Sequence, residues 1–264
     1  MTRPSQPAAA PVPAPASANA ETPASRAASP TRSQNVSRSA SGVAPGKKSA
    51  VNALPLPPAG PQWYGSLMGT GIAATLTQTL SGDLPGAQAL AVVLLVIGWF
   101  IFVGLTAAFG LRIARRPAVL AGTIRDLPVL ATWGMVAMGV LSLGSATATV
   151  VPAHWPSLAP AAWAVDGVLW TVGTVLGILT ALGFAVRLIG RDVGAPTTTW
   201  GLPIVPPMVS ATTGSALVPH LATREGQLLL VITTVACFFL ALVLGLVVFA
   251  VAYHHHWRVA PLPV

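Results

Sequence analysis

The residues that could do chemistry in this chain are small, hydroxylated and uncharged, and they lie inside apolar stretches. Gly69, Thr70 and Gly71 leave one stretch nearly without side-chain bulk. Backbone and hydroxyl dipoles at such a place can replace part of the hydration shell of an ion in a pore. Small residues also allow two helices to approach closely. The stretch therefore fits either a pore wall or a tight helix contact.

A second group is built from proline. Pro203, Pro206 and Pro207 fall within five residues, and Ser210 follows them. Each proline removes a backbone donor and clashes with a preceding carbonyl, so the helix must bend or break here. In lipid a broken helix is tolerated only where protein or water satisfies the freed groups. We interpret this region as a kink that lines a cavity, with a purely structural bend as the alternative.

Other reactive side chains do not form a recognisable site. Ser145 and Ser215 each follow a glycine, and His220 could act as a base, but the G-x-S-G motif of intramembrane serine proteases is absent. The sequence therefore predicts no enzymatic activity. Three consecutive histidines, 254–256, would splay around a helix and favour an interfacial cluster over a metal site. We expect no metal and no cofactor.

Two isolated residues have simple interpretations. Cys237, the only cysteine, sits in an apolar run and is expected to be a buried small hydrophobe. Asp166 is the only acidic residue near the membrane interior. It is expected at the outer start of its helix, where it would reach headgroups or water.

Composition indicates a membrane protein. Of 264 residues, 53% are hydrophobic and only 8% are charged, whereas soluble domains carry about 25% charged residues. The net charge of +8 comes from basic residues in the N-terminal region and beside the apolar segments. No base-reading or stacking motif accompanies them, so nucleic acid is not an expected partner. The expected surroundings are a lipid bilayer.

Six membrane-spanning helices, paired as three hairpins, are predicted within an all-α transmembrane domain at 54–258. The first, third and fifth are lean and rich in Gly, Thr, Ser and Pro, whereas the others are full runs of bulky aliphatics. Bulky aliphatics suit lipid contact, and small or hydroxylated residues suit helix contacts or water. The alternation predicts inner helices within an outer set. The expected spans are about 62–80, 87–111, 127–150, 163–187, 199–220 and 227–253.

Loop charges predict the orientation. The loop between the second and third spans carries four arginines, whereas the loop between the third and fourth carries no Lys or Arg. The positive-inside rule then places both termini in the cytoplasm of a multi-pass plasma-membrane protein. Residues 1–53, rich in Ala, Pro and Ser, are expected to be a disordered cytoplasmic tail, and 259–264 a short C-terminal tail. The predicted inner basic rim consists of Arg112, Arg115, Arg116 and Arg125.

Two motifs carry a family resemblance. Residues 68–72, MGTGI, and 202–211, LPIVPPMVSA, resemble the tellurite-resistance/dicarboxylate transporter family. That family includes slow anion channels, malate permeases and sulfite efflux pumps. The resemblance covers about residues 60–255 and implies transport of a small anion, such as a C4-dicarboxylate, sulfite or tellurite.

The resemblance also implies a fold and a set of pore residues. The family fold has ten helices in five hairpins, with odd helices around a central pore, and members often form trimers. By position, the pore-lining candidates are Gly69, Thr70, Gly71, Gly134, Gly139, Ser142, Pro203, Pro206, Pro207 and Ser210. Only six helices are predicted here, so relative to the family the chain is truncated at its C-terminal end, and helices seven to ten, with the gating phenylalanine of the ninth, have no counterpart. The alternative function is a non-transporting remnant or assembly subunit.

Overall fold

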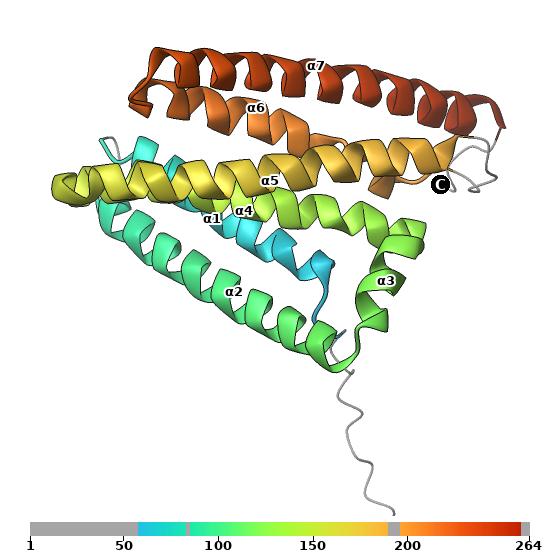
Figure 1. The fold of residues 1–264 in the computed structure, drawn as a ribbon, viewed down its shortest axis with the longest axis horizontal. Helices are drawn as coiled ribbons and strands as arrows, with labels where there is room; N and C mark the ends of the chain where they lie inside the picture. Colours follow the sequence, from blue (N-terminus) through green and yellow to red (C-terminus); the bar gives the residue numbers. More distant parts are fainter. Residues whose placement is uncertain (1–57, 83–84, 190–195, 260–264) are drawn as a thin grey trace, which may run out of the picture. The chain divides into compact units, whose positions relative to one another are not determined.

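In the computed structural model, the described residues are 58–82, 85–189 and 196–259, and all of their regular structure is helical. The predicted tail at 1–53 lies outside these residues, and so do 260–264 of the predicted tail at 259–264. Short single-turn helices join the longer ones, among them η1 (Pro61–Trp63) before α1 and η3 (Thr198–Gly201) before α6. The α-helices are α1 (Tyr64–Thr79), α2 (Ala87–Arg115), α3 (Ala118–Arg125), α4 (Leu127–His154), α5 (Ala159–Leu188), α6 (Val205–Leu217) and α7 (Arg224–His254) (Figure 1).

Four helical segments within the described ranges are long and apolar enough to cross a membrane. They are Ala87–Arg115, Leu127–His154, Pro156–Leu188 and Arg224–Arg258. A helix needs about 20 residues to cross about 30 Å of hydrocarbon. With 16 and 13 residues, α1 and α6 are too short on their own to meet that length. The described part of the chain therefore has four apolar membrane-length helices, and six spans stay a prediction.

Helix α4 lies at the centre of residues 58–259. It packs against α1, α2, α3, α5 and α6, while α1 also packs on α2 and α6 on α7 (Figure 1). Its middle, Val136–Gly144, is buried at every position, because Gly, Ala and Ser on several faces let neighbouring backbones approach. Helices that follow one another in the chain therefore pack side by side, although their arrangement as three membrane hairpins stays a prediction.

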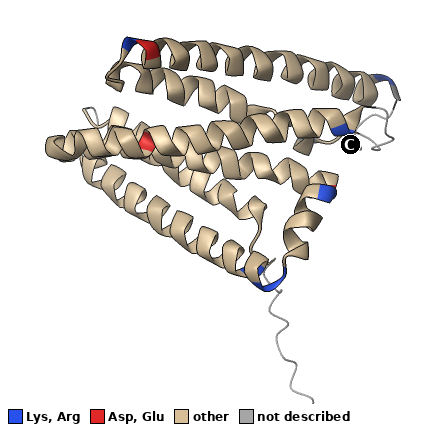
Figure 2. Cartoon of the chain, viewed as in Figure 1, with Lys and Arg blue, Asp and Glu red and all other residues tan. Residues whose placement is uncertain are grey.

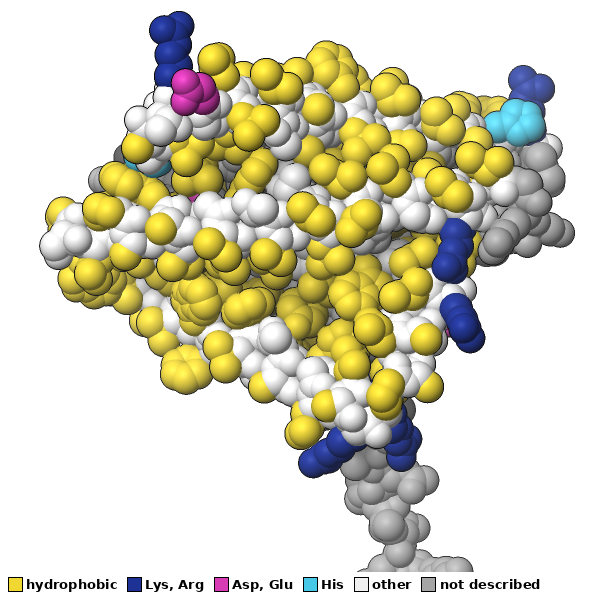
Figure 3. All heavy atoms as spheres, viewed as in Figure 1, with side chains coloured by type: hydrophobic (Ala, Val, Ile, Leu, Met, Phe, Trp, Pro, Cys, Tyr) yellow, Lys and Arg dark blue, Asp and Glu magenta, His cyan; other side chains and the backbone are white. Residues whose placement is uncertain are grey.

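The outer helices α2 and α7 carry most of the bulky surface. Phe100 is 75% exposed, Leu229 68% and Phe249 67%. Hydrophobic side chains spread over the face in Figure 3, and Lys and Arg lie at its edges. Exposed aliphatic and aromatic side chains of this kind are compatible with contact to acyl chains. The contrast between lean and bulky helices in the sequence thus corresponds to a buried α4 beside exposed α2 and α7.

Side-chain hydrogen bonds fix helices α1, α2 and α4 together. Tyr64 and Thr106 share a hydroxyl–hydroxyl bond of 3.0 Å between α1 and α2. The indole N–H of Trp99 donates to Thr147 Oγ1 on α4 at 3.2 Å. Between helices in a membrane, polar contacts of this kind are worth about 0.6 kcal/mol each. They set the rotation of α1 and α2 about the central helix, and so they position the residues of the candidate site.

Candidate transport site

The first candidate pore residues meet where α1 crosses α4. A Cβ built on Gly71 would lie 2.8 Å from the carbonyl carbon of Ser142, and one on Gly139 would lie 3.0 Å from the carbonyl oxygen of Tyr64. Ser142 is only 3% exposed, and its hydroxyl donates to the Met138 carbonyl at 2.7 Å. The small residues here permit a close helix contact.

The proline group begins a helix. The turn at 202–204 follows η3, and α6 starts at Val205 with Pro206 and Pro207 in its first turn. Proline is well placed there, because the first N–H groups of a helix have no intrahelical partner. The predicted interruption is therefore real, and it takes the form of a new helix rather than a kink within one.

The prolines at this break are buried against protein. Pro203, Pro206 and Pro207 are among the most buried side chains. A Cβ on Gly134 of α4 would overlap the carbonyl oxygen of Leu202, and one on Gly177 of α5 would lie 2.8 Å from the Pro206 Cβ. Glycines on α4 and α5 thus make room for the start of α6.

Ser210, one turn further along α6, is also fully buried. Its hydroxyl donates to the Pro206 carbonyl at 3.1 Å, and its own carbonyl accepts the indole N–H of Trp170 at 2.9 Å. Gly69 and Thr70 are not part of these contacts: Gly69 is exposed, and the methyl of Thr70 faces Gly98 on α2. The structure therefore brings eight of the ten candidates to buried helix contacts, and their lining of a pore stays a prediction.

Other hydroxyl residues on the same three helices are accessible, and the sequence analysis did not propose them as pore-lining residues. They keep partly or fully exposed surface while neighbouring small residues are buried. Several donate to a carbonyl of their own helix, as Thr149 does to Ser145 at 2.8 Å, which leaves the hydroxyl oxygen able to accept. Examples of these accessible residues are Ser66 on α1, Ser145 and Thr149 on α4, and Thr212 and Ser215 on α6.

Basic residues collect at the ends of α2, α3 and α5 (Figure 2). Arg115, Arg116 and Arg125 are exposed, and Arg112 is half-buried. The guanidinium of Arg112 donates to the Ala59 carbonyl at 2.6 Å, which ties the segment before α1 to the end of α2.

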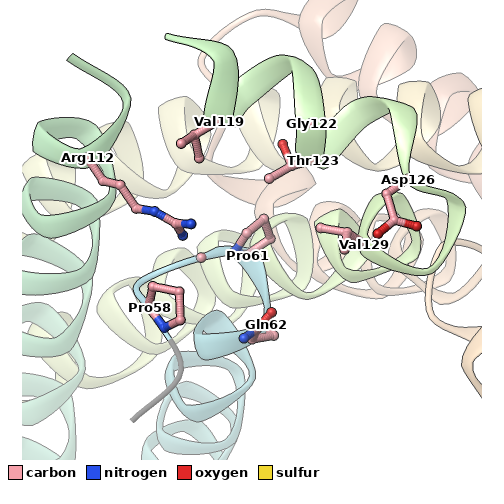
Figure 4. A pocket seen from close by; sticks show the side chains of 10 residues that line it. Pro58, Pro61, Gln62, Arg112, Val119, Gly122, Thr123, Asp126 and Val129 are labelled. Atoms are coloured by element: carbon pink, nitrogen blue, oxygen red, sulfur yellow. The ribbon is translucent and has the colours of Figure 1, made fainter. Parts of the chain in front are cut away.

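A cavity of about 490 Å³ opens beside Arg112 (Figure 4). Arg112 points into it from one side and Asp126 lies at the other, so the cavity offers a guanidinium together with one carboxylate. Thr123 and Gln62 add a hydroxyl and an amide. Its lining is Pro58, Gly60, Pro61, Gln62, Arg112, Val119, Gly122, Thr123, Asp126 and Val129.

Asp166 is not at an interface, and that expectation was wrong. The side chain is 3% exposed, and its Oδ1 has no hydrogen-bond partner among the described residues. A Cβ on Gly144 of α4 would lie 2.5 Å from Oδ1, so the carboxyl sits directly over that glycine. The sequence gives the position of Asp166 along its helix but not the face it occupies. An acidic group buried inside a membrane helix is a candidate functional group.

The remaining reactive side chains are structural in character. His220 is exposed and stacks on Trp163 with ring centroids 4.0 Å apart. Cys237 is buried and free, as predicted. A ring nitrogen of His256 lies 3.1 Å from the Pro196 carbonyl. Within 58–82, 85–189 and 196–259, no three His, Cys, Asp or Glu residues are grouped so that they could hold a metal ion.

Comparison with known proteins identifies the family. The family model described as voltage-dependent anion channel, SLAC1, matches residues 59–264. The chain belongs to this family, which confirms the resemblance stated from the two motifs. No solved structure matches the chain significantly.

Curated relatives agree with this assignment. The sulfite efflux pump SSU1 of Arthroderma otae is 28% identical over 182 residues, which are 67% of this chain and 47% of the pump. The sulfite efflux pump SSU1 of Trichophyton rubrum is 24% identical over 197 residues, 73% of this chain and 52% of the pump. The chain thus spans about half the length of the curated relatives it matches. It is a membrane protein of an anion-transport family.

Proposed function

We propose that this chain forms part of a channel or transporter for small anions of the C4-dicarboxylate, sulfite or tellurite class. The observation that carries the proposal is the family match over residues 59–264. The named function of the two relatives, sulfite efflux, supports an oxyanion as the solute.

The chemistry of the lean helices fits a weak passage for anions. Helices α1, α4 and α6 contain no Asp, Glu, Lys or Arg. A path along them is polar only through hydroxyls and backbone dipoles, which can replace part of a hydration shell without trapping the ion. The accessible hydroxyls of these helices, with Gly69 and Thr70, form the wall of the passage, and the eight buried candidates pack the helices that carry this wall.

The arginines give the passage its charge selectivity. Arg112, Arg115, Arg116 and Arg125 concentrate anions at one mouth, since a basic rim raises the local concentration of counter-ions. The same arginines place that mouth in the cytoplasm by the positive-inside rule. The protein then lies in the plasma membrane with six spans, arranged as three hairpins, and both termini inside.

The rest of the pore wall comes from further helices. Three lean helices supply part of a ring, and the chain spans about half of its relatives. In lipid an open polar flank must be covered by protein. The family resemblance supports additional helices of the same fold in this role, and an assembly of complete subunits as a trimer.

Flux measurements test the proposal. The purified full chain is reconstituted into liposomes, and efflux of sulfite, malate and tellurite is compared with efflux from empty liposomes. Anion efflux above the empty control, without matching cation efflux, supports transport by the chain itself. Efflux equal to the control supports the alternative, a non-transporting remnant or assembly subunit.

A further inference from the structure

A groove opens between α3, α4 and α5, away from the lean helix contacts. Its volume is about 320 Å³, and its lining is apolar except for Thr180 and Arg187. We propose that this α4–α5 groove binds one acyl chain of an anionic phospholipid, whose phosphate contacts Arg187. The lining residues are Ile124, Leu130, Trp133, Leu176, Leu179, Thr180, Gly183 and Arg187.

The length of the groove matches one leaflet of a bilayer. Along α5 its lining runs from Leu176 to Arg187, eleven residues further on. At 1.5 Å per residue this is about 16 Å. Half of a hydrocarbon core of about 30 Å is nearly the same distance. With Arg187 at the level of the headgroups, the apolar end at Leu176 lies close to the bilayer midplane.

The volume of the groove favours a lipid chain over a protein helix as its occupant. A helix segment 16 Å long and at least 10 Å across occupies roughly 1,200 Å³. The groove offers about a quarter of that volume. A single flexible acyl chain fits such a space. Its methylenes gain dispersion contacts with the side chains that line the groove, which favours binding.

Arg187 is held in position to receive a phosphate. Its Nη1 donates to the carbonyls of Ile124 and Arg125, at 2.8 and 3.1 Å. Both of these hydrogen bonds to described residues are donated by the same nitrogen, Nη1. A guanidinium presents five donors in a planar fork that suits phosphate oxygens.

Among the described residues that line the groove, Arg187 is the only one that carries a charge. Arg125, which is exposed, adds a second positive charge beside Arg187. Asp126, which follows Arg125 in the sequence, lines the cavity beside Arg112 and is not among the residues that line this groove. Basic residues at the headgroup level attract anionic lipids, at about 1 kcal/mol for each residue.

The wall of the groove is preformed. The indole N–H of Trp133 donates to Thr123 Oγ1 at 3.3 Å, and its ring packs 5.9 Å from that of Phe109. Opposite this ring, Gly183 leaves open space, since a Cβ there would meet no atom within 4 Å. A larger residue at Gly183 would therefore fill the groove without displacing protein.

Native mass spectrometry of the full chain tests the proposal, with phosphatidylglycerol and phosphatidylcholine of identical acyl chains supplied in equal amounts. We expect the wild type to retain phosphatidylglycerol preferentially. The Arg187→Gln variant should retain about fivefold less phosphatidylglycerol, since one basic residue near the lipid is lost, with phosphatidylcholine unchanged. The Gly183→Leu variant should lose both lipids from the groove.

Matched controls separate the groove from the rest of the surface. Gly104→Leu makes the same change at another open glycine, on α2, and Arg224→Gln removes an exposed arginine at the start of α7, outside the basic rim and the groove; both should retain lipid as the wild type does. Equal retention of the two lipids by the wild type overturns the proposal, as does full retention by Gly183→Leu. Should Arg187→Gln fail to fold, the Gly183→Leu comparison decides alone, and neither result depends on transport activity.

Discussion

Gly71 of α1 lies against Ser142 of α4 so closely that a Cβ on Gly71 would come within 2.9 Å of the Ser142 Cβ. Two residues earlier, a Cβ on Gly69 would have no atom of another residue within 4 Å. Successive residues on a helix are about 100° apart, so Gly69 and Gly71 face in nearly opposite directions. One glycine serves packing, and the other leaves its side of the helix open.

The two glycines predict opposite effects of the same substitution. We expect Gly71→Ala to destabilise the protein by about 1–3 kcal/mol, because the new methyl overlaps the backbone of Ser142. Gly69→Ala is the matched control and should be neutral or stabilising by up to about 1 kcal/mol, since alanine favours the helix. Thermal unfolding in detergent measures both. Equal melting temperatures for the two variants would contradict the close contact.

The contact between Gly144 and Asp166 predicts coupling between α4 and α5. A methyl on Gly144 would lie 2.5 Å from Asp166 Oδ1, so Gly144→Ala should destabilise the protein by about 2 kcal/mol. In an Asp166→Ala background the obstacle is smaller, and the cost should fall by about 1 kcal/mol. A double-mutant cycle on unfolding free energies measures this difference. Additive effects would show that the carboxyl does not occupy the space over Gly144.

Hydropathy and loop charge were sufficient to locate the helices along the chain. Each of α1, α2, α4, α5, α6 and α7 overlaps one of the expected segments, because runs of apolar residues bounded by charge or by Gly and Pro specify helix positions. The short α3 was missed, since its eight residues fall inside a loop that was interpreted only for its charge. The proline group predicted an interruption within the fifth span, and α6 starts there, because proline cannot continue a helix but can begin one.

The faces of the helices could not be deduced in the same way. Asp166 was expected at an interface, but its burial depends on Gly144, a residue on another helix. Small residues were expected to line a pore, yet glycine permits both close packing and an open wall. Which of the two occurs at Gly69 and Gly71 depends on the helix that lies opposite. A single sequence does not specify that pairing.

Arg112 predicts a flux that depends on ionic strength. It lines the cavity at the basic end of the described helices, so Arg112→Gln should reduce anion entry from that side in dilute buffer. The deficit should shrink in about 1 M salt, where the screening length falls from about 30 Å to about 3 Å. Initial rates in liposomes at the two salt concentrations measure the effect. Arg224→Gln, at the start of α7 in a loop predicted on the other side, is the control and should leave this entry rate unchanged. A deficit that persists undiminished in high salt would argue against an electrostatic role.

Accessible hydroxyls and exposed aliphatic residues predict different reactivity when replaced by cysteine. Ser145 of α4 and Thr212 of α6 belong to the proposed passage, whereas Val175 of α5 and Leu246 of α7 are exposed on bulky helices. Only ionised thiols react well with methanethiosulfonates, and ionisation requires water nearby. In liposomes, a membrane-impermeant charged reagent should therefore modify cysteines at the first two positions much faster than those at the last two. The native Cys237 is buried and is replaced by alanine in the background, so each signal reports one site. Equal rates at all four positions would mean that the lean helices do not face water, and the proposed passage would have to be abandoned.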